Sequence, residues 1–312
     1  MEPDQPVFAY IVPLRRWAKS SLTEFSAYLQ QLPSEADVIV VDGSAAEIFA
    51  SHSAELPARV RHVPILPASS TPNGKVGGVI AGMRATEAQR VVIADDDVRY
   101  RTEELKAVLA RLDVADVVRP QNYFAPLPWH AQWDTARMLL NRMSGGDWPG
   151  TLGVRRSAFM RAGGYAGDVL FENFELVRTL RRNGGREDVA LDLYVRRQPP
   201  DARRFFEQRV RQAYDEFARP ARMAAFLAVL PLLAAIVALQ AWLTLGGVVV
   251  VLVLIAEAGR RRSGGTAYFP WQASLFAPLW LLERGLCSWI ALARRSRGGI
   301  AYAGTTLQRA AT

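Results

Sequence analysis

Three consecutive aspartates, Asp95, Asp96 and Asp97, are the residues whose type and spacing point most directly to chemistry. They follow an apolar run at residues 90–94, which is typical of a buried strand. Carboxylates this close repel one another, so each favours solvent or a cation. Mg²⁺ or Mn²⁺ prefers such oxygen ligands, usually one or two carboxylates together with substrate phosphates. Because alternate residues of an extended segment point to one side, Asp95 and Asp97 are the predicted metal ligands; a solvated acidic turn is the alternative.

Two further polar residues occupy comparable positions. Asp42 ends a second apolar run, at residues 37–42, and Lys75 lies in a glycine-rich stretch at residues 73–78 that we expect to form a turn opening a helix. In open α/β sheets, ligands bind beyond the carboxyl ends of the strands. We therefore expect Asp42 and the aspartate cluster to face one crevice.

The elements that must position these residues alternate between strand and helix. This alternation predicts an α/β fold with a mostly parallel sheet flanked by helices. Strands are expected at residues 7–12, 37–42, 59–63, 90–94 and 115–119, with helices between them. The following part is less regular, with helices expected at 133–143, 174–182 and 205–217 and strands at 151–154 and 189–195.

The C-terminal part has a different composition. Residues 223–256 carry no charge, and as one helix they would span about 50 Å, against about 30 Å for the apolar core of a membrane. We favour a hairpin turning near Gln240 or at residues 246–247 over one tilted span. Residues 271–293 are apolar but contain Glu283 and Arg284, so that helix is either interfacial or spanning. The predicted domains are thus residues 1–220 and a membrane anchor at residues 221–312.

Charge and cysteine content narrow the class of protein. The formal net charge is +8, and much of the arginine excess flanks the apolar segments, which favours a membrane surface over nucleic acid. The single cysteine, Cys287, excludes an internal disulfide and a cysteine-based zinc site. Residues 1–6 are acidic and polar and do not form a secretory signal. We expect the folded domain to lie on the cytoplasmic side of the inner (cell) membrane.

Taken together, the motifs resemble those of inverting family-2 glycosyltransferases with the GT-A fold, a Rossmann-like sheet. The matching stretches, in order, are Asp42-Gly-Ser44, Asn73-Gly-Lys75 with Gly77-Gly78, and Asp95-Asp-Asp97. Asp95-Asp-Asp-Val-Arg99 further resembles a form found in membrane-bound bacterial relatives of ceramide glucosyltransferase. The resemblance covers about residues 7–215. It implies a nucleotide-sugar donor, with a UDP-sugar favoured, a lipid acceptor and a Mg²⁺ or Mn²⁺ ion.

The resemblance also implies roles in donor binding. Asp42 would accept a hydrogen bond from the nucleotide base, although a turn former explains it equally well. Lys75 would lie near the diphosphate, with the neighbouring glycines allowing close backbone approach; a solvated turn lysine is the alternative. Asp95 and Asp97 would contact the ribose and the metal-bound diphosphate, with Asp97 the principal metal ligand. Asp96 would be an exposed neighbour.

An inverting transfer needs a base for the acceptor hydroxyl. The resemblance places it in a Glu-Asp pair after a Gly-Gly-Tyr turn, and the corresponding residues here are Glu172 and Asn173. An amide cannot act as a base, so we assign the base to Glu172, with Glu175 as the substitute and Asn173 as an acceptor contact. Stabilisation of a helix N-terminus is the alternative role of both glutamates.

Two further matches are partial. Gln208-Arg-Val-Arg211 matches the start of a Gln-x-x-Arg-Trp motif, but Gln212 replaces the tryptophan. Arg211 would neutralise the leaving diphosphate with Gln208 beside it, unless this stretch is simply a basic helix on anionic lipid. Trp148 falls where the family lines its acceptor pocket, although ordinary core packing explains it too.

These residues leave several functions open. The favoured one is transfer of a sugar to a membrane lipid in glycolipid biosynthesis. Transfer to a polyprenyl phosphate and catalytically silent nucleotide-sugar binding, suggested by Asn173, are the rivals. A nucleotidyltransferase would share the fold and the acidic cluster, but it fits poorly with the apolar segments.

Overall fold

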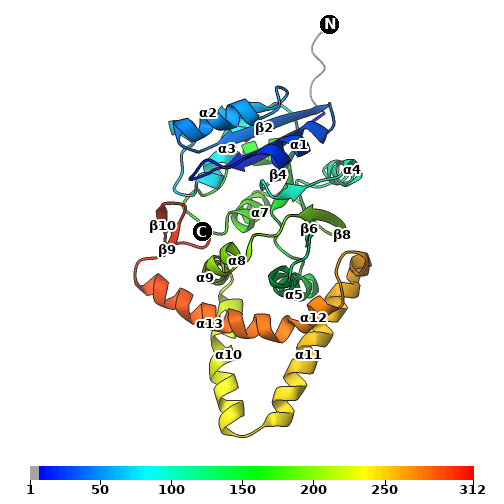
Figure 1. The fold of residues 1–312 in the computed structure, drawn as a ribbon, viewed down its shortest axis with the longest axis vertical. Helices are drawn as coiled ribbons and strands as arrows, with labels where there is room; N and C mark the ends of the chain where they lie inside the picture. The colour runs from blue at the N-terminus through cyan, green and yellow to red at the C-terminus, as the bar shows by residue number, and fades with distance from the viewer. Residues whose placement is uncertain (1–6) are drawn as a thin grey trace. The chain divides into compact units, whose positions relative to one another are not determined.

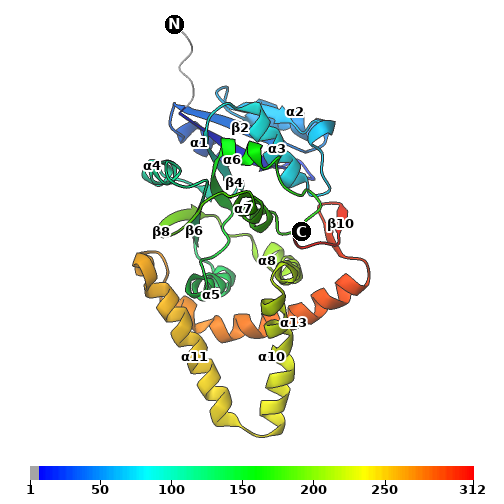
Figure 2. The same ribbon diagram turned by 180° about the vertical axis from the view of Figure 1, so that it is seen from behind.

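The structure, a computed structural model, describes residues 7–312 and shows two compact units (Figures 1 and 2). The first six residues, on which the prediction of no secretory signal depends, lie outside the described residues. The first unit contains the chain up to Pro120 with Pro149–Asp168 and Glu172–Val195, and the second contains Gln121–Trp148, Val169–Phe171 and Arg196–Thr312. The units differ from the predicted domains at residues 1–220 and 221–312, because α5 (Trp129–Met143) packs with the C-terminal helices α11 and α13.

A large mixed sheet supports the first unit, in the order β3-β2-β1-β4-β7-β6-β8-β5. Its strands are β1 Phe8–Leu14, β2 Ala36–Asp42, β3 Arg61–Pro64, β4 Arg90–Ala94, β5 Val98–Arg99, β6 Val117–Phe124, β7 Thr151–Arg155 and β8 Glu187–Arg197. The strands β3, β2, β1 and β4 are parallel, while β7 runs antiparallel to both β4 and β6. The predicted α/β architecture is confirmed, and the carboxyl ends of β1, β2 and β4 lie at one edge.

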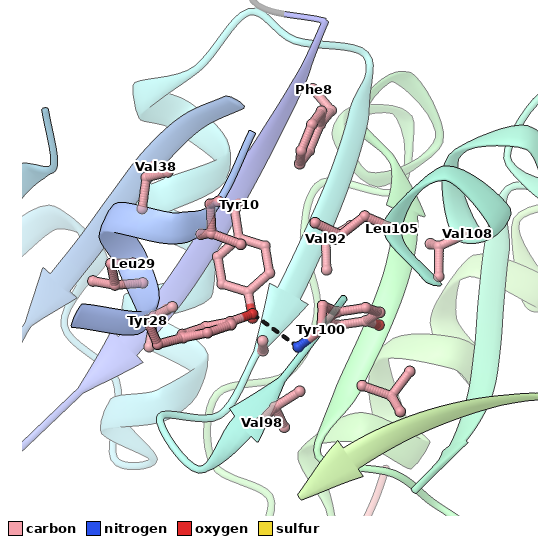
Figure 3. Close-up of a cluster of buried hydrophobic side chains, with 14 of the residues drawn as sticks. Phe8, Tyr10, Tyr28, Leu29, Val38, Val92, Val98, Tyr100, Leu105 and Val108 are labelled. Atoms are coloured by element: carbon pink, nitrogen blue, oxygen red, sulfur yellow. Dashed lines mark hydrogen bonds between the residues drawn. The ribbon is translucent and has the colours of Figure 1, made fainter. Parts of the chain in front are cut away.

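Alternation along β1 divides the helices of this unit between two faces of the sheet. Phe8, Tyr10 and Val12 pack in a buried cluster with α1 (Thr23–Gln31) and α4 (Thr102–Arg111), as Figure 3 shows. Within this cluster the hydroxyls of Tyr10 and Tyr28 lie 3.0 Å apart, and the backbone N–H of Tyr100 donates to Tyr28 at 3.0 Å. Both buried phenol hydroxyls therefore have hydrogen-bond partners, so their burial costs little free energy.

The opposite face of β1 receives α3 (Gly74–Ala85), and glycine allows the contact. A Cβ on Gly82 would lie 2.5 Å from Cγ2 of Ile11, and one on Gly77 would lie 2.5 Å from the carbonyl oxygen of Ser69. The expected turn at residues 73–78 is thus mostly helix. Gly78 and Gly82 let α3 pack against β1, while the close approach of a diphosphate to the backbone stays a prediction.

The remaining helices of the first unit are short connections around the sheet: α2 Ala46–Glu55, η1 Pro67–Ser69, α6 Arg156–Arg161 and α7 Glu172–Arg182.

Helices dominate the second unit. Besides α5 they are α8 Ala202–Glu207, α9 Arg209–Tyr214, η2 Asp215–Ala218, α10 Pro220–Ala238, α11 Trp242–Arg261, η3 Arg262–Ala267, α12 Gln272–Leu275 and α13 Ala277–Ser296, with a small hairpin of β9 Ile300–Tyr302 and β10 Thr305–Leu307.

The single helix predicted at residues 205–217 is wrong, because the chain breaks at Gln208 into α8 and α9. The carbonyl of Phe205 accepts from the backbone N–H of Gln208 at 3.3 Å and from Nε of Arg209 at 3.1 Å. The buried Arg209 side chain therefore takes a carbonyl that a continuous helix would use.

The two C-terminal apolar helices are confirmed. α10 has 19 residues and α11 has 20, so each helix is about 30 Å long. Both helices extend beyond the uncharged segment, because α10 begins at Pro220 and α11 ends at Arg261. Gln240, with φ of 53°, lies in the turn between them, while Gly246 and Gly247 lie inside α11. Both α10 and the segment Trp242–Ala267 are long and apolar enough to cross a membrane, by length and composition.

The last long helix, α13, passes across this hairpin (Figures 1 and 2). One of its faces is buried and includes Ala277, Trp280 and Ala291, while leucines such as Leu282 and Leu286 on the other face are exposed. Within residues 7–312, α13 is not among the helices that satisfy the criteria for a span. Whether α13 is interfacial or spans a membrane stays a prediction.

A buried arginine of α5 forms hydrogen bonds to the end of α11. The side chain of Arg142 is fully buried, and its Nε donates to the carbonyl of Gly259 at 2.9 Å, with a second bond to the carbonyl of Arg262. A Cβ on Gly259 would lie 2.0 Å from the carbonyl oxygen of Leu139. The end of α11 is thus capped by a charged side chain from α5 at a point of close backbone approach.

The close approach of α3 to β1 makes a testable prediction. Gly82→Ala should lower the free energy of unfolding by about 1–3 kcal/mol, because the added Cβ overlaps Ile11. Helix propensity alone would give the opposite sign, since alanine is favoured over glycine by about 1 kcal/mol. Gly74→Ala, in the same helix but with its nearest neighbour at 3.5 Å, is the matched control and should be neutral. Equal denaturant midpoints for the Gly82 variant and the wild type would refute this packing.

Candidate active site

An ion-paired cluster of three residues lies at the carboxyl end of β4. Nζ of Lys75, in the first turn of α3, is 2.6 Å from Oδ1 of Asp95 and 2.7 Å from Oε1 of Glu172. Glu172 is the first residue of α7, and the backbone N–H of Asp95 donates to the carbonyl of Gly150 at 2.8 Å. Three elements distant in sequence thus bring one ammonium between two carboxylates.

Burial and charge act in opposite directions on Lys75. Burial disfavours the ammonium, but the charges and hydrogen bonds of Asp95 and Glu172 outweigh it, so the pKa of Lys75 is raised. The side chain therefore remains charged at neutral pH. It is a permanent cation at the end of the sheet, where an anion can compete with the two carboxylates.

The N-terminus of α3 is shaped by Asn73. Its buried side-chain oxygen accepts from the backbone N–H of Lys75 at 3.1 Å. The backbone N–H of Asn73 donates to the carbonyl of Gly167 at 2.8 Å. This N-cap fixes where α3 begins and so where Lys75 points.

Asp96 differs from its prediction as an exposed neighbour, because it is ion-paired to Arg16. Arg16 follows β1, and its backbone N–H donates to the hydroxyl of Ser44 at 2.9 Å. Both residues thus lie at the sheet edge that carries Asp42 and Asp95. The sequence prediction missed Arg16, although its place just beyond a strand end was an available signal. Asp97 follows in the same half-exposed turn.

Asp42 is fully buried and accepts three hydrogen bonds. Its Oδ1 accepts from the backbone N–H of Ser44 at 2.8 Å, while Oδ2 lies 2.6 Å from Nδ1 of His52 and 3.1 Å from Nε2 of His62. The His62 ring stacks on Phe49 with centroids 3.9 Å apart. Neither histidine was predicted. The carboxylate thus uses three of its roughly four acceptor positions within the protein.

The three candidate catalytic residues on α7 have different surroundings. Only Glu172 lies in the Lys75 cluster. The side-chain amide of Asn173 donates to the carbonyl of Pro149 at 2.8 Å, which links α7 to the segment that precedes β7. Glu175 is buried and accepts from Arg178 at 2.6 Å, which leaves it poorly placed to act as a base.

The other predicted residues belong to the second unit. Trp148 is half-buried and packs edge-to-face on Phe171, with ring centroids 5.4 Å apart. Gln208 lies at the break between α8 and α9, and the guanidinium of Arg211 lies over the ring of Tyr302 at 5.2 Å. Their roles toward acceptor and donor stay predictions.

The aspartates at the end of β4 could hold a metal ion only together with ligands from outside the chain. Among residues 7–312, no three His, Cys, Asp or Glu side chains are grouped so that they could hold a metal ion. Asp95 and Asp97 still offer hard oxygen atoms of the type that Mg²⁺ and Mn²⁺ prefer. Two carboxylates fit such an ion if a substrate diphosphate completes its coordination.

Comparison with known proteins shows which fold the chain shares with solved structures. No protein-family model and no curated protein matches the chain. Among solved structures, the mannosyltransferase PcManGT from Pyrobaculum calidifontis, in complex with GDP-Man and Mn²⁺, matches with a TM-score of 0.50 and 17% identity over 95% of this chain and 77% of that one. The chain has a GT-A-like fold.

Two structures of S. aureus TarS 1–349 are less similar. Their TM-scores are 0.42 and, in complex with UDP-GlcNAc, 0.43, at 19% and 18% identity. The matches cover 66% and 64% of this chain and 64% and 60% of those chains.

Asp42 makes stability depend on pH. Burial alone would raise its pKa, but hydrogen bonds from Ser44, His52 and His62 outweigh burial and lower it below 3.8. The resulting stabilisation is complete above pH 3.8 and is lost as pH falls through the lower folded value. Asp42→Asn should therefore lower the free energy of unfolding by about 1–3 kcal/mol at pH 7, and this free energy should fall less steeply in acid than that of the wild type.

Urea unfolding at pH 7 and pH 3 checks this prediction. Asp113→Asn removes a carboxylate that is 64% exposed, so it should change the unfolding free energy by less than about 0.5 kcal/mol. An Asp42→Asn variant as stable as this control at pH 7 would show that the hydrogen bonds contribute nothing.

Proposed function

We propose that this chain is a glycosyltransferase that moves a sugar from a nucleotide-sugar donor to a lipid acceptor at a membrane. The cluster of Lys75, Asp95 and Glu172 is the observation that carries the proposal. It combines a permanent cation, a carboxylate at a strand end and a possible base at the edge of the sheet where α/β folds bind ligands. The GT-A-like fold supports this choice of reaction.

The proposed donor is a nucleoside diphosphate sugar, with UDP as the favoured nucleotide. Its diphosphate would compete with Asp95 and Glu172 for the ammonium of Lys75. Asp42 is proposed to accept a hydrogen bond from the nucleotide base, since its carboxylate accepts three bonds within the protein and can accept roughly one more. Gln208 and Arg211 remain proposed diphosphate contacts.

A Mg²⁺ or Mn²⁺ ion is proposed at Asp97 and Asp95. When bound, the ion would neutralise charge on the diphosphate and so favour departure of the nucleotide. The likeness to a mannosyltransferase complexed with GDP-Man and Mn²⁺ supports the proposal.

Glu172 is the proposed base of an inverting displacement. The acceptor hydroxyl oxygen would bond to the anomeric carbon while the bond from that carbon to the phosphate oxygen breaks. The hydroxyl proton passes to the Glu172 carboxylate, and the nucleoside diphosphate leaves. When the donor phosphate draws Lys75 away, the Glu172 carboxylate is released from its ion pair and can accept a hydrogen bond from the acceptor hydroxyl. Donor binding and base activation would thus be coupled.

The acceptor is proposed to be a lipid because of the C-terminal helices. Large exposed apolar side chains lie along α10, α11 and the outer face of α13, among them Leu232, Val250, Leu254 and Leu286. Arginines lie at both ends of the hairpin, which supports a cytoplasmic position for the sheet unit at the inner membrane. Trp148 is the proposed acceptor contact.

Asn173 favours a second candidate, a catalytically silent nucleotide-sugar-binding protein. Its amide holds the carbonyl of Pro149 and has no basic group to offer. In such a protein, Lys75 would keep Glu172 permanently paired. Donor binding without turnover distinguishes the two candidates.

The first experiment is a screen of UDP- and GDP-sugars against membrane lipid extract, with lipid products identified by mass. Glu172→Gln should lower the rate of transfer about 10²–10⁴-fold while donor affinity stays within about threefold or improves. Asp113→Asn, an exposed carboxylate in the same unit, is the matched control. Unchanged transfer by Glu172→Gln would exclude Glu172 as the base, and donor binding without any product would favour the silent protein.

Metal removal makes a separate prediction. A chelator should abolish transfer, and Mn²⁺ or Mg²⁺ should restore it. Asp97→Ala should weaken donor binding at least about tenfold in the presence of the metal and by much less in its absence. Transfer that persists after chelation would contradict a metal-dependent reaction, while pyrophosphate release would instead indicate a nucleotidyltransferase.

A further inference from the structure

A groove in the second unit lies beside the charged end of the apolar hairpin. Its volume is about 430 Å³, and it is formed by α11, α12 and the residue before α12. The lining residues are Val253, Leu254, Glu257, Arg260, Arg261, Trp271, Ser274 and Leu275. None of them belongs to the proposed donor or acceptor contacts.

The polar side of the groove has more guanidinium groups than carboxylates. Glu257 lies 2.6 Å from Nε of Arg260 and 2.6 Å from Nε of Arg261, so one carboxylate serves both cations. Ser274 also donates to Glu257, at 3.3 Å. The Arg261 side chain is 72% exposed, so its remaining donors are accessible to an anion, whereas Arg260 also donates to the carbonyl of Phe269 at 3.3 Å.

The rest of the groove is apolar and exposed. Leu254, Trp271 and Leu275 are each more than half exposed, although each is large and hydrophobic. Tryptophan in this setting is typical of the boundary between lipid and water. A ligand for the whole groove must therefore combine a hydrocarbon chain with an anionic group.

We propose that this groove binds an anionic phospholipid. The phosphate would bind Arg261 together with Arg260, and an acyl chain would lie against Leu254, Leu275 and Trp271. The excess positive charge of the groove supports a head group of net negative charge over a zwitterionic one, and the apolar wall supports a lipid over free phosphate. The inference rests on the membrane association within the proposed function, but it concerns a separate site.

Glu257 limits the affinity of this site, because the phosphate competes with its carboxylate for both arginines. Replacing Glu257 by glutamine would leave two guanidinium groups without a carboxylate. Glu257→Gln is therefore expected to bind the anionic lipid more tightly, a gain that a misfolded variant could not produce.

Native mass spectrometry of the full chain, released from neutral detergent, tests the proposal without a charged bilayer surface. Phosphatidylglycerol should be retained, and phosphatidylcholine should be retained at least about tenfold less. Arg260→Gln combined with Arg261→Gln should reduce retention of phosphatidylglycerol about thirtyfold. Arg294→Gln combined with Arg297→Gln removes the same charge at the exposed end of α13 and should change retention less than about threefold.

The other outcomes are equally decisive. Equal retention of the two lipids, equal loss in both double variants, or no gain in Glu257→Gln would overturn the proposal. Displacement of the lipid by millimolar inorganic phosphate would show that the site takes the free anion. Flotation with vesicles separates the two proposals: no flotation contradicts membrane association itself, whereas flotation without preference for phosphatidylglycerol contradicts only this site.

Discussion

The ammonium of Lys75 is the interaction on which the proposed chemistry depends. It lies between the carboxylates of Asp95 and Glu172, which would otherwise repel each other and Asp97 at the end of the sheet. The arrangement requires the first turn of α3 to lie beside the carboxyl end of β4. That approach is possible because glycines let α3 pack directly on β1 and on the carbonyl of Ser69. The same cation that neutralises the cluster is also the group most suited to receive a diphosphate.

A second constraint shapes the helical unit, where charged groups are buried beside apolar helices. Arg137 and Asp134 form an ion pair at 3.0 Å, and Arg137 also donates to Asp147 at 2.5 Å, while Arg209 pairs with Asp134 at 3.0 Å. Arg142 is satisfied by backbone carbonyls at the end of α11. Breaking one such buried pair leaves a charge without a partner, which is strongly unfavourable, so these residues hold the helices in a defined arrangement.

The sequence was sufficient for most of the fold because apolar runs closed by polar or turn residues mark buried strands well. The strand at residues 90–94 matches β4, and the aspartates were correctly expected just beyond it. Asp42, Lys75 and Glu172 could be selected by pattern. The two histidines that hydrogen-bond Asp42 could not, because His52 and His62 reach it only through the tertiary fold, whereas Arg16, which pairs with Asp96, at least had its place beyond a strand end as a signal. Local periodicity also missed the break at Gln208, which depends on where a buried arginine finds its hydrogen bonds.

The central claim is that Lys75 binds the donor diphosphate in exchange for its two carboxylates. Titration calorimetry of the screened nucleotide sugar with Mn²⁺ tests it most directly, comparing wild type with Lys75→Met and with Lys106→Met, an exposed lysine on α4. Donor binding should be weakened about 10–100-fold in Lys75→Met, the effect of a lost charge-assisted contact, and unchanged in Lys106→Met. Equal affinity in all three proteins, with Lys75→Met shown to be folded, would contradict it.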